Sequence, residues 1–124
     1  MARSADGRAA NPFESVLRAI AAEHLRVIPQ QRIVTSRLVA RPDLVDVGRR
    51  IVLEADSHTW HSSRAALARD CARYNALVLA DWTVYRFAWE QVMFEAELVR
   101  ETLAEARVRA DGQAQPRIRR RGVA

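Results

Sequence analysis

The sequence predicts an α/β (α+β) domain in which helices flank a mixed four-stranded sheet, in the order α-β-β-β-α-β-α. Three observations predict this class. Apolar residues recur at helical spacing near the start, in the middle and towards the end of the chain. Three short segments rich in β-branched residues follow one another between residues 30 and 56. A fourth such segment, 82–87, follows the middle helix, which therefore crosses over to it.

The first helix is predicted to begin at Asn11 and to run to about residue 27. Asn11 suits the N-cap, Pro12 suits the first helical position, and Glu14 stands three residues after the cap. Apolar residues then keep helical spacing, and Pro29 ends the element.

The next three elements are strands, of which the last two form a hairpin. Their segments read RIVTSRLV, PDLVDV and RIVLEAD, and Gly48-Arg49 lies between the second and the third. Glycine at the first central position is typical of a two-residue type II′ turn. This turn predicts that Val45 pairs with Val52 and that Leu44 pairs with Leu53.

The second half of the chain predicts a helix, a strand and a last helix. Ser62 or Ser63 can cap a helix over about 64–80. Its predicted buried side consists of Ala66, Leu67, Cys71, Tyr74, Leu77 and Val78. The fourth strand covers 82–87, and the last helix runs from about 90 to 107. We expect a flexible N-terminus over 1–10, a single domain over 11–107 and an Arg-rich flexible tail over 108–124.

The composition shows where the net positive charge lies and which reactive side chains are missing. The net charge is +5, and residues 107–124, with six arginines and one aspartate, account for all of it. The chain contains no lysine, so no mechanism can use a catalytic lysine. Its single cysteine excludes an intrachain disulfide. No apolar run approaches the length of a membrane span or resembles a secretory signal, so we expect a cytoplasmic protein without membrane association.

The hairpin register predicts that acids meet at one end of the sheet. Asp43 would lie opposite Glu54, and Asp56 would project from the same face as Glu54. Facing carboxylates repel, and a divalent cation such as Mg²⁺ would relieve the repulsion. Glu14 could add an oxygen, although it could equally be the capping-box partner of Asn11. Each acid could also be an ordinary solvated residue, and we interpret Asp46, on the other face, as a solvent or turn acid.

Five segments, in this order and spacing, resemble the PD-(D/E)XK nuclease superfamily, in particular its very-short-patch-repair-endonuclease-like branch. They are NPFE at 11–14, RPDLVD at 41–46, IVLEADSHTWH at 51–61, ARDCARYNAL at 68–77 and WTVYRFAWEQV at 82–92. The resemblance covers about residues 11–106 and implies a restriction-endonuclease-like core. It also implies a metal-dependent DNA endonuclease that hydrolyses phosphodiester bonds with Mg²⁺ or Mn²⁺.

Carried over to this chain, the resemblance implies Asp43 and Glu54 as metal ligands and Glu14, Asp56 and His61 as further catalytic residues. Asp56 stands where the superfamily has its lysine, and His61 would orient or deprotonate the attacking water. Phosphates would be held by arginines, since a guanidinium binds two oxygens at once. The candidates are Arg64, Arg69, Arg73 and Arg86.

Two alternatives remain open at the level of sequence. The missing lysine also fits a catalytically inactive nucleic-acid-binding or accessory module with the same fold. Asp70 and Arg73 have the spacing of an ordinary helix ion pair, and Arg86 could pair with an acid for structural reasons. DNA is the expected partner, and a homodimer is possible because one site cuts one strand.

Overall fold

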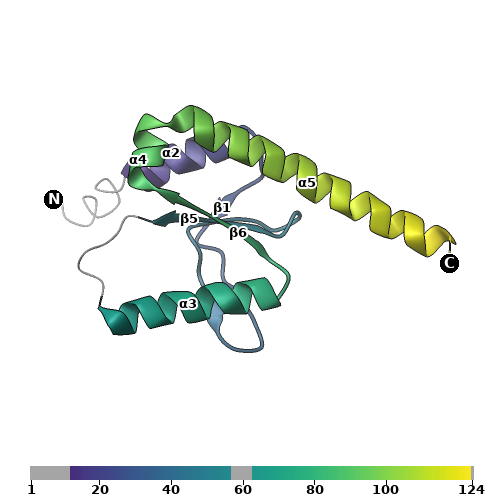
Figure 1. Ribbon diagram of the computed structural model, residues 1–124, viewed down its shortest axis with the longest axis horizontal. Helices are drawn as coiled ribbons and strands as arrows, with labels where there is room; N and C mark the ends of the chain where they lie inside the picture. Colours follow the sequence, from purple (N-terminus) through teal and green to yellow (C-terminus); the bar gives the residue numbers. More distant parts are fainter. Residues whose placement is uncertain (1–11, 57–62, 124) are drawn as a thin grey trace.

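The protein forms three layers, with the sheet between two layers of helices (Figure 1). The computed structural model describes residues 12–56 and 63–123, with side chains up to residue 114. The helices are α2 (Pro12–Ala21), α3 (Arg64–Leu79), α4 (Trp89–Phe94) and α5 (Ala96–Val123). The strands are β1 (Ile28–Pro29), β2 (Ile33–Val34), β3 (Val39–Ala40), β4 (Leu44–Asp46), β5 (Ile51–Asp56) and β6 (Thr83–Ala88). Helix α3 covers one face of the sheet, and α2, α4 and α5 cover the other.

The predicted fold class, a mixed four-stranded sheet flanked by helices, is confirmed. The strand order is β1-β4-β5-β6, in which β4 is antiparallel to β1 and β5, and β5 is parallel to β6. Helix α3 makes the crossover between the two parallel strands.

The first strand of the sheet differs from the prediction. The segment after residue 30 does not join the main sheet but folds on itself as the β2–β3 hairpin, and β1 takes the edge position instead. Gln30 has a positive φ of 55°, which redirects the chain after β1. The Thr35 hydroxyl accepts hydrogen bonds from the backbone N–H groups of Arg37 and Leu38, which closes the β2–β3 turn.

The β4–β5 register is confirmed, but the turn that makes it is of another kind. Val45 pairs with Val52 and Leu44 pairs with Leu53, as predicted, and Asp46 pairs with Ile51. Four residues, 47–50, connect the last pair, and Gly48 does not have the positive φ of a type II′ turn. The positive φ, 56°, falls on Arg50 instead, whose guanidinium stacks 4.4 Å from the centre of the Trp82 ring.

Apolar side chains of β5 project alternately to the two faces of the sheet, and each face has its own hydrophobic core. Ile51 and Leu53 pack against α2 and α5, while Val52 packs with Leu77 and Trp82 under α3. The residue after Leu53 therefore faces α3, and that residue is Glu54.

Helix α3 buries far less than its sequence predicts. Ser63 caps it as expected, since its side chain accepts a hydrogen bond from the Ala66 N–H. Ala76 and Leu77 are its buried residues. The other predicted core residues do not enter the core: Ala66 is half-buried, and Leu67, Cys71, Tyr74 and Val78 are exposed. These exposed side chains lie along one stripe of the helix, at spacings of four, three and four residues.

Both terminal helices end at other positions than predicted. Helix α2 stops at Ala21, because the next N–H groups of Glu23 and His24 bond three residues back and tighten the last turn. At the other end the last helix does not stop near residue 107 as predicted, since α5 continues to Val123. Asp111 fastens this extension to the body through an ion pair of 2.9 Å with Arg49 in the hairpin turn.

Candidate functional site

The acids of the hairpin lie where β5 and β6 end, on the face that α3 covers. Asp43 directly precedes β4, and Glu54 and Asp56 are alternate residues of β5. Arg86 of β6 is in register with Glu54, and Arg73 reaches the same place from α3. Three strands and one helix therefore position this group of side chains, which we call the acid–arginine cluster.

Glu54 is the buried member of the cluster. Its exposed fraction is 8%, and it forms an ion pair with Arg73, whose Nη2 lies 3.6 Å from Oε1. Burial raises the pKa of Glu54 from 4.5 to about 7, Arg73 acts to lower it, and the charge of Asp43 raises it further. The prediction that Asp43 and Glu54 repel each other thus agrees with the electrostatics of the site.

Asp43 is held in place by the backbone of the neighbouring strands. Its carboxylate accepts a hydrogen bond of 2.8 Å from the Ala55 N–H, next to Glu54. Its own carbonyl accepts one of 3.2 Å from the Gln30 N–H. The carboxylate is half-buried and fixed beside the end of β5.

The remaining acids of the cluster are bound to arginines. Arg86 donates to Asp56 at 2.9 Å and lies 4.0 Å from Asp70, which Arg73 contacts at 3.2 Å. The structural pairing expected for Arg86 with an acid is thus present, and Asp70 and Arg73 do form the i, i+3 pair. The acid–arginine cluster consists of Asp43, Glu54, Asp56, Asp70, Arg73 and Arg86. With all groups ionised it carries four negative and two positive charges, an excess of two negative charges.

The three predicted acids do not form a ready-made ligand set. Within residues 12–56 and 63–123 no group of three or more histidine, cysteine, aspartate or glutamate side chains could hold a metal ion. Asp56 forms an ion pair with Arg86 instead. Glu14 is half-buried in the first turn of α2, which packs on the opposite side of the sheet from α3, so it does not complete a group of three with Asp43 and Glu54. Two carboxylates remain, and Mg²⁺ is commonly held by one or two carboxylates together with water and phosphate oxygens.

The other predicted residues are placed as follows. His61 lies outside the described residues. Arg64 and Arg69 are exposed on α3. In the described part of the chain neither guanidinium has an ion pair. Both are therefore open to a polyanion approaching the end of α3.

Asp46 was interpreted as a solvent or turn acid, and only the turn role is right. It is 2% exposed and accepts hydrogen bonds from the N–H groups of Arg26 and Arg49, at 3.0 and 3.1 Å. The Arg49 guanidinium adds an ion pair of 2.9 Å. Burial acts to raise the pKa of Asp46, but these hydrogen bonds outweigh it and hold the pKa below 3.8. An aspartate that opens a turn is the sequence signal that indicates this role.

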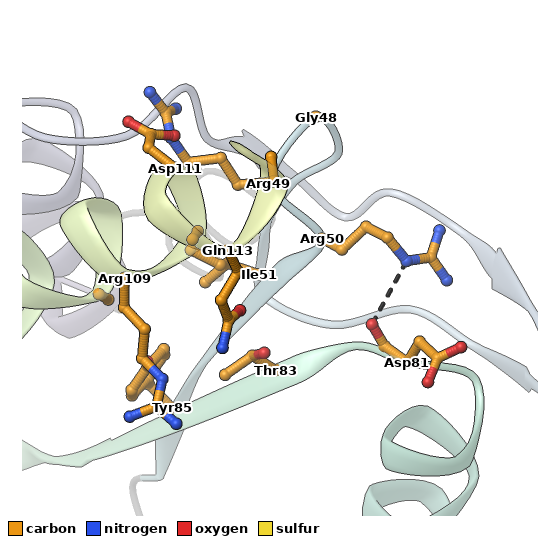
Figure 2. Close-up of a pocket in the computed structure, with 13 residues that line it drawn as sticks. Gly48, Arg49, Arg50, Ile51, Asp81, Thr83, Tyr85, Arg109, Asp111 and Gln113 are labelled. Atoms are coloured by element: carbon orange, nitrogen blue, oxygen red, sulfur yellow. Dashed lines mark hydrogen bonds and ion pairs between the residues drawn. The ribbon is translucent and has the colours of Figure 1, made fainter. Parts of the chain in front are cut away.

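A hollow lies at the other end of β5 from the acid–arginine cluster, between the hairpin turn and α5 (Figure 2). Its cavity volume is about 260 Å³. Arg50, which lines it, donates to the Asp81 carbonyl, and Arg49 is paired with Asp111. These arginines already have partners that fasten the turn to its neighbours. We therefore interpret this hollow as a structural junction.

Comparisons of the chain with protein-family models, with curated proteins and with solved structures gave no match. In the described part of the chain no helix is long and apolar enough to cross a membrane. The functional interpretation therefore depends on the geometry of the acid–arginine cluster.

Proposed function

We propose that this protein is a metal-dependent endonuclease that hydrolyses phosphodiester bonds of DNA at the acid–arginine cluster. The observation that carries the proposal is the fixed pair of Asp43 and the buried Glu54, in surroundings with an excess of negative charge. Buried carboxylates are stable when paired or coordinated to a cation. A perturbed pKa in such a cluster is typical of functional sites.

Asp43 and Glu54 would hold a Mg²⁺ or Mn²⁺ ion, which supplies polarisation of the phosphoryl oxygen and a water of lowered pKa. Because Glu54 retains its proton up to a pH of about 7, the proton competes with the cation and activity should rise with pH through neutrality. Arg73 and Arg86 would bind the phosphate oxygens, in exchange for their present contacts with Asp70 and Asp56.

A nucleic-acid-binding module without catalysis is the second candidate. Arg73 already lies 3.6 Å from Glu54, so the buried acid has a cation of the protein's own. The described residues offer only two carboxylates for a metal ion, and the chain contains no lysine.

If the protein is the endonuclease, its single active site would cut one strand at a time. Cutting both strands of a duplex would then require a second copy of the protein or a second binding event.

Plasmid nicking separates the two candidates. Supercoiled plasmid is incubated with the protein and Mg²⁺ or Mn²⁺, with EDTA as a control, and the nicked fraction is followed on agarose. We expect metal-dependent nicking that Asp43→Asn reduces on the order of 100-fold or more. Asp81→Asn, at an exposed aspartate outside the cluster, should leave nicking unchanged.

The result that contradicts the endonuclease is binding without cleavage. If the protein shifts DNA in a gel but nicks none with either metal, the binding module is the better interpretation. Nicking that survives Asp43→Asn would mean that the cluster is not the active site.

A further inference from the structure

A cavity of about 450 Å³ opens beside the acid–arginine cluster, between α3 and the edge strand β6. It is lined by Cys71, Tyr74, Asn75, Val84 and Arg86. Strand β6 is the last strand of the sheet, so this side of the cavity is not covered by another strand. We propose that this cavity binds one unpaired nucleobase of the nucleic-acid substrate, next to the phosphate that is cut. The inference rests on the proposed function and adds the class of substrate.

The lining has the chemistry that a nucleobase requires. Tyr74, 39% exposed, offers a ring on which a base can stack, and Val84 offers an apolar wall. The amide of Asn75 has both donor and acceptor groups, as the edge of a base does. A volume of about 450 Å³ has room for a base and part of its sugar.

Arg86 connects the cavity with the acid–arginine cluster. It lines the cavity, is in register with Glu54 and donates to Asp56 at 2.9 Å. A base in the cavity would therefore place its own phosphate at the arginines, within reach of Glu54. Arg64 and Arg69, exposed along α3, would meet the phosphates that follow.

The position of the cavity favours an unpaired nucleotide over an intact base pair. In a duplex each base is covered on both faces by its neighbours and cannot lie against a protein ring. Single-stranded nucleic acid, or a strand with an extruded nucleotide, exposes the face that Tyr74 requires. The predicted substrate is thus single-stranded or locally unpaired.

The competing occupant is a second copy of the chain. Tyr74 belongs to the exposed stripe of α3 formed by Leu67, Cys71, Tyr74 and Val78, whose spacing is also typical of a helix–helix contact. Val78 lies on this stripe but does not line the cavity. Replacing each residue separately therefore distinguishes a base pocket from a contact between copies.

The test measures binding without metal, so it does not depend on cleavage. An oligonucleotide containing 2-aminopurine is titrated with the protein in EDTA, as a single strand and as a full duplex, and fluorescence quenching gives Kd. We expect quenching of the single strand, and about 5- to 100-fold weaker binding by Tyr74→Leu. Tyr74→Phe, which keeps the ring, and Val78→Ser, which leaves the cavity intact, should bind as the parent does.

Three results would overturn the inference. The first is equal binding of the single strand by Tyr74→Leu and the parent. The second is preference for the full duplex. The third is a common loss of binding by Tyr74→Leu and Val78→Ser together with a change of oligomeric state in sedimentation, which would identify a contact between copies. If Asp43-dependent nicking is present and this binding is absent, only the base pocket fails; if binding is present and nicking is absent, only the endonuclease fails.

Discussion

Replacing Glu54 by glutamine should change how stability depends on pH. The folded protein holds the Glu54 proton up to a pH of about 7, whereas a free glutamate loses it near 4.5. Between these values the folded state binds more protons than the unfolded state, so the free energy of unfolding falls as pH rises. The difference, about 7 minus 4.5, is about 2.5 units, and at ~1.4 kcal/mol per unit it amounts to ~3 kcal/mol.

Glutamine resembles the protonated acid and does not titrate. The difference in unfolding free energy between Glu54→Gln and the parent should therefore increase by ~3 kcal/mol in favour of the variant from about pH 4 to about pH 8. Urea denaturation followed by circular dichroism measures this difference, and taking it between two proteins cancels the titration of groups that do not interact with Glu54. Glu101→Gln, which removes one carboxylate at an exposed position of α5, is the matched control.

Magnesium provides a second arm of the same experiment. If Asp43 and Glu54 hold the ion, it should stabilise the parent at about pH 8, where Glu54 is ionised, and much less at about pH 5. Glu54→Gln should lose this stabilisation. A pH-independent difference between Glu54→Gln and the parent would refute the claim that Glu54 is buried with a raised pKa.

Two further predictions concern the hairpin turn and the N-cap of α3. Asp46→Ala should lower the free energy of unfolding at neutral pH by ~2–3 kcal/mol in urea denaturation, because the backbone N–H groups of Arg26 and Arg49 lose their buried acceptor. An effect below ~0.5 kcal/mol would contradict this role. Ser63→Ala should cost ~1 kcal/mol through loss of the α3 cap, with faster amide exchange in the first turn of α3; unchanged exchange there would contradict it.

The part of the site that could be predicted from sequence is the part fixed by local periodicity. Alternate residues of a strand project from the same face of the sheet, so Glu54 and Asp56 lie on one face. The position of the hairpin turn then determines which residue of β4 pairs with each residue of β5. The register held although the turn type was wrong, because Leu44 and Leu53 are both apolar and pair on the core side. The hydrophobic pattern thus determined the register more strongly than the turn chemistry.

The exposed stripe of α3 could not be predicted in the same way. Leu67, Tyr74 and Val78 have helical spacing, and the same spacing is expected of a face that packs in the core or against another molecule. The choice between these depends on where the helix meets the sheet, which is a long-range property. In the structure the sheet face under α3 is filled by Ala76 and Leu77 and, further along, by charged side chains.

The hairpin carries two buried carboxylates, and the contrast between them supports the proposal that Glu54 belongs to a functional site. Asp46 receives two backbone N–H groups and a guanidinium at 2.9 Å, and its pKa is held below the usual value. Glu54 is similarly inaccessible, but its ion pair with the Arg73 guanidinium is longer, at 3.6 Å, and its pKa is raised to about 7. An acid whose charge serves the fold is surrounded by donors, as Asp46 is. A buried acid with few donors destabilises the fold once it ionises, and a ligand that supplies the missing positive charge would remove this cost. Glu54, beside Asp43, is therefore the position at which a cation would stabilise the protein most, and this asymmetry supports the cluster as the functional site.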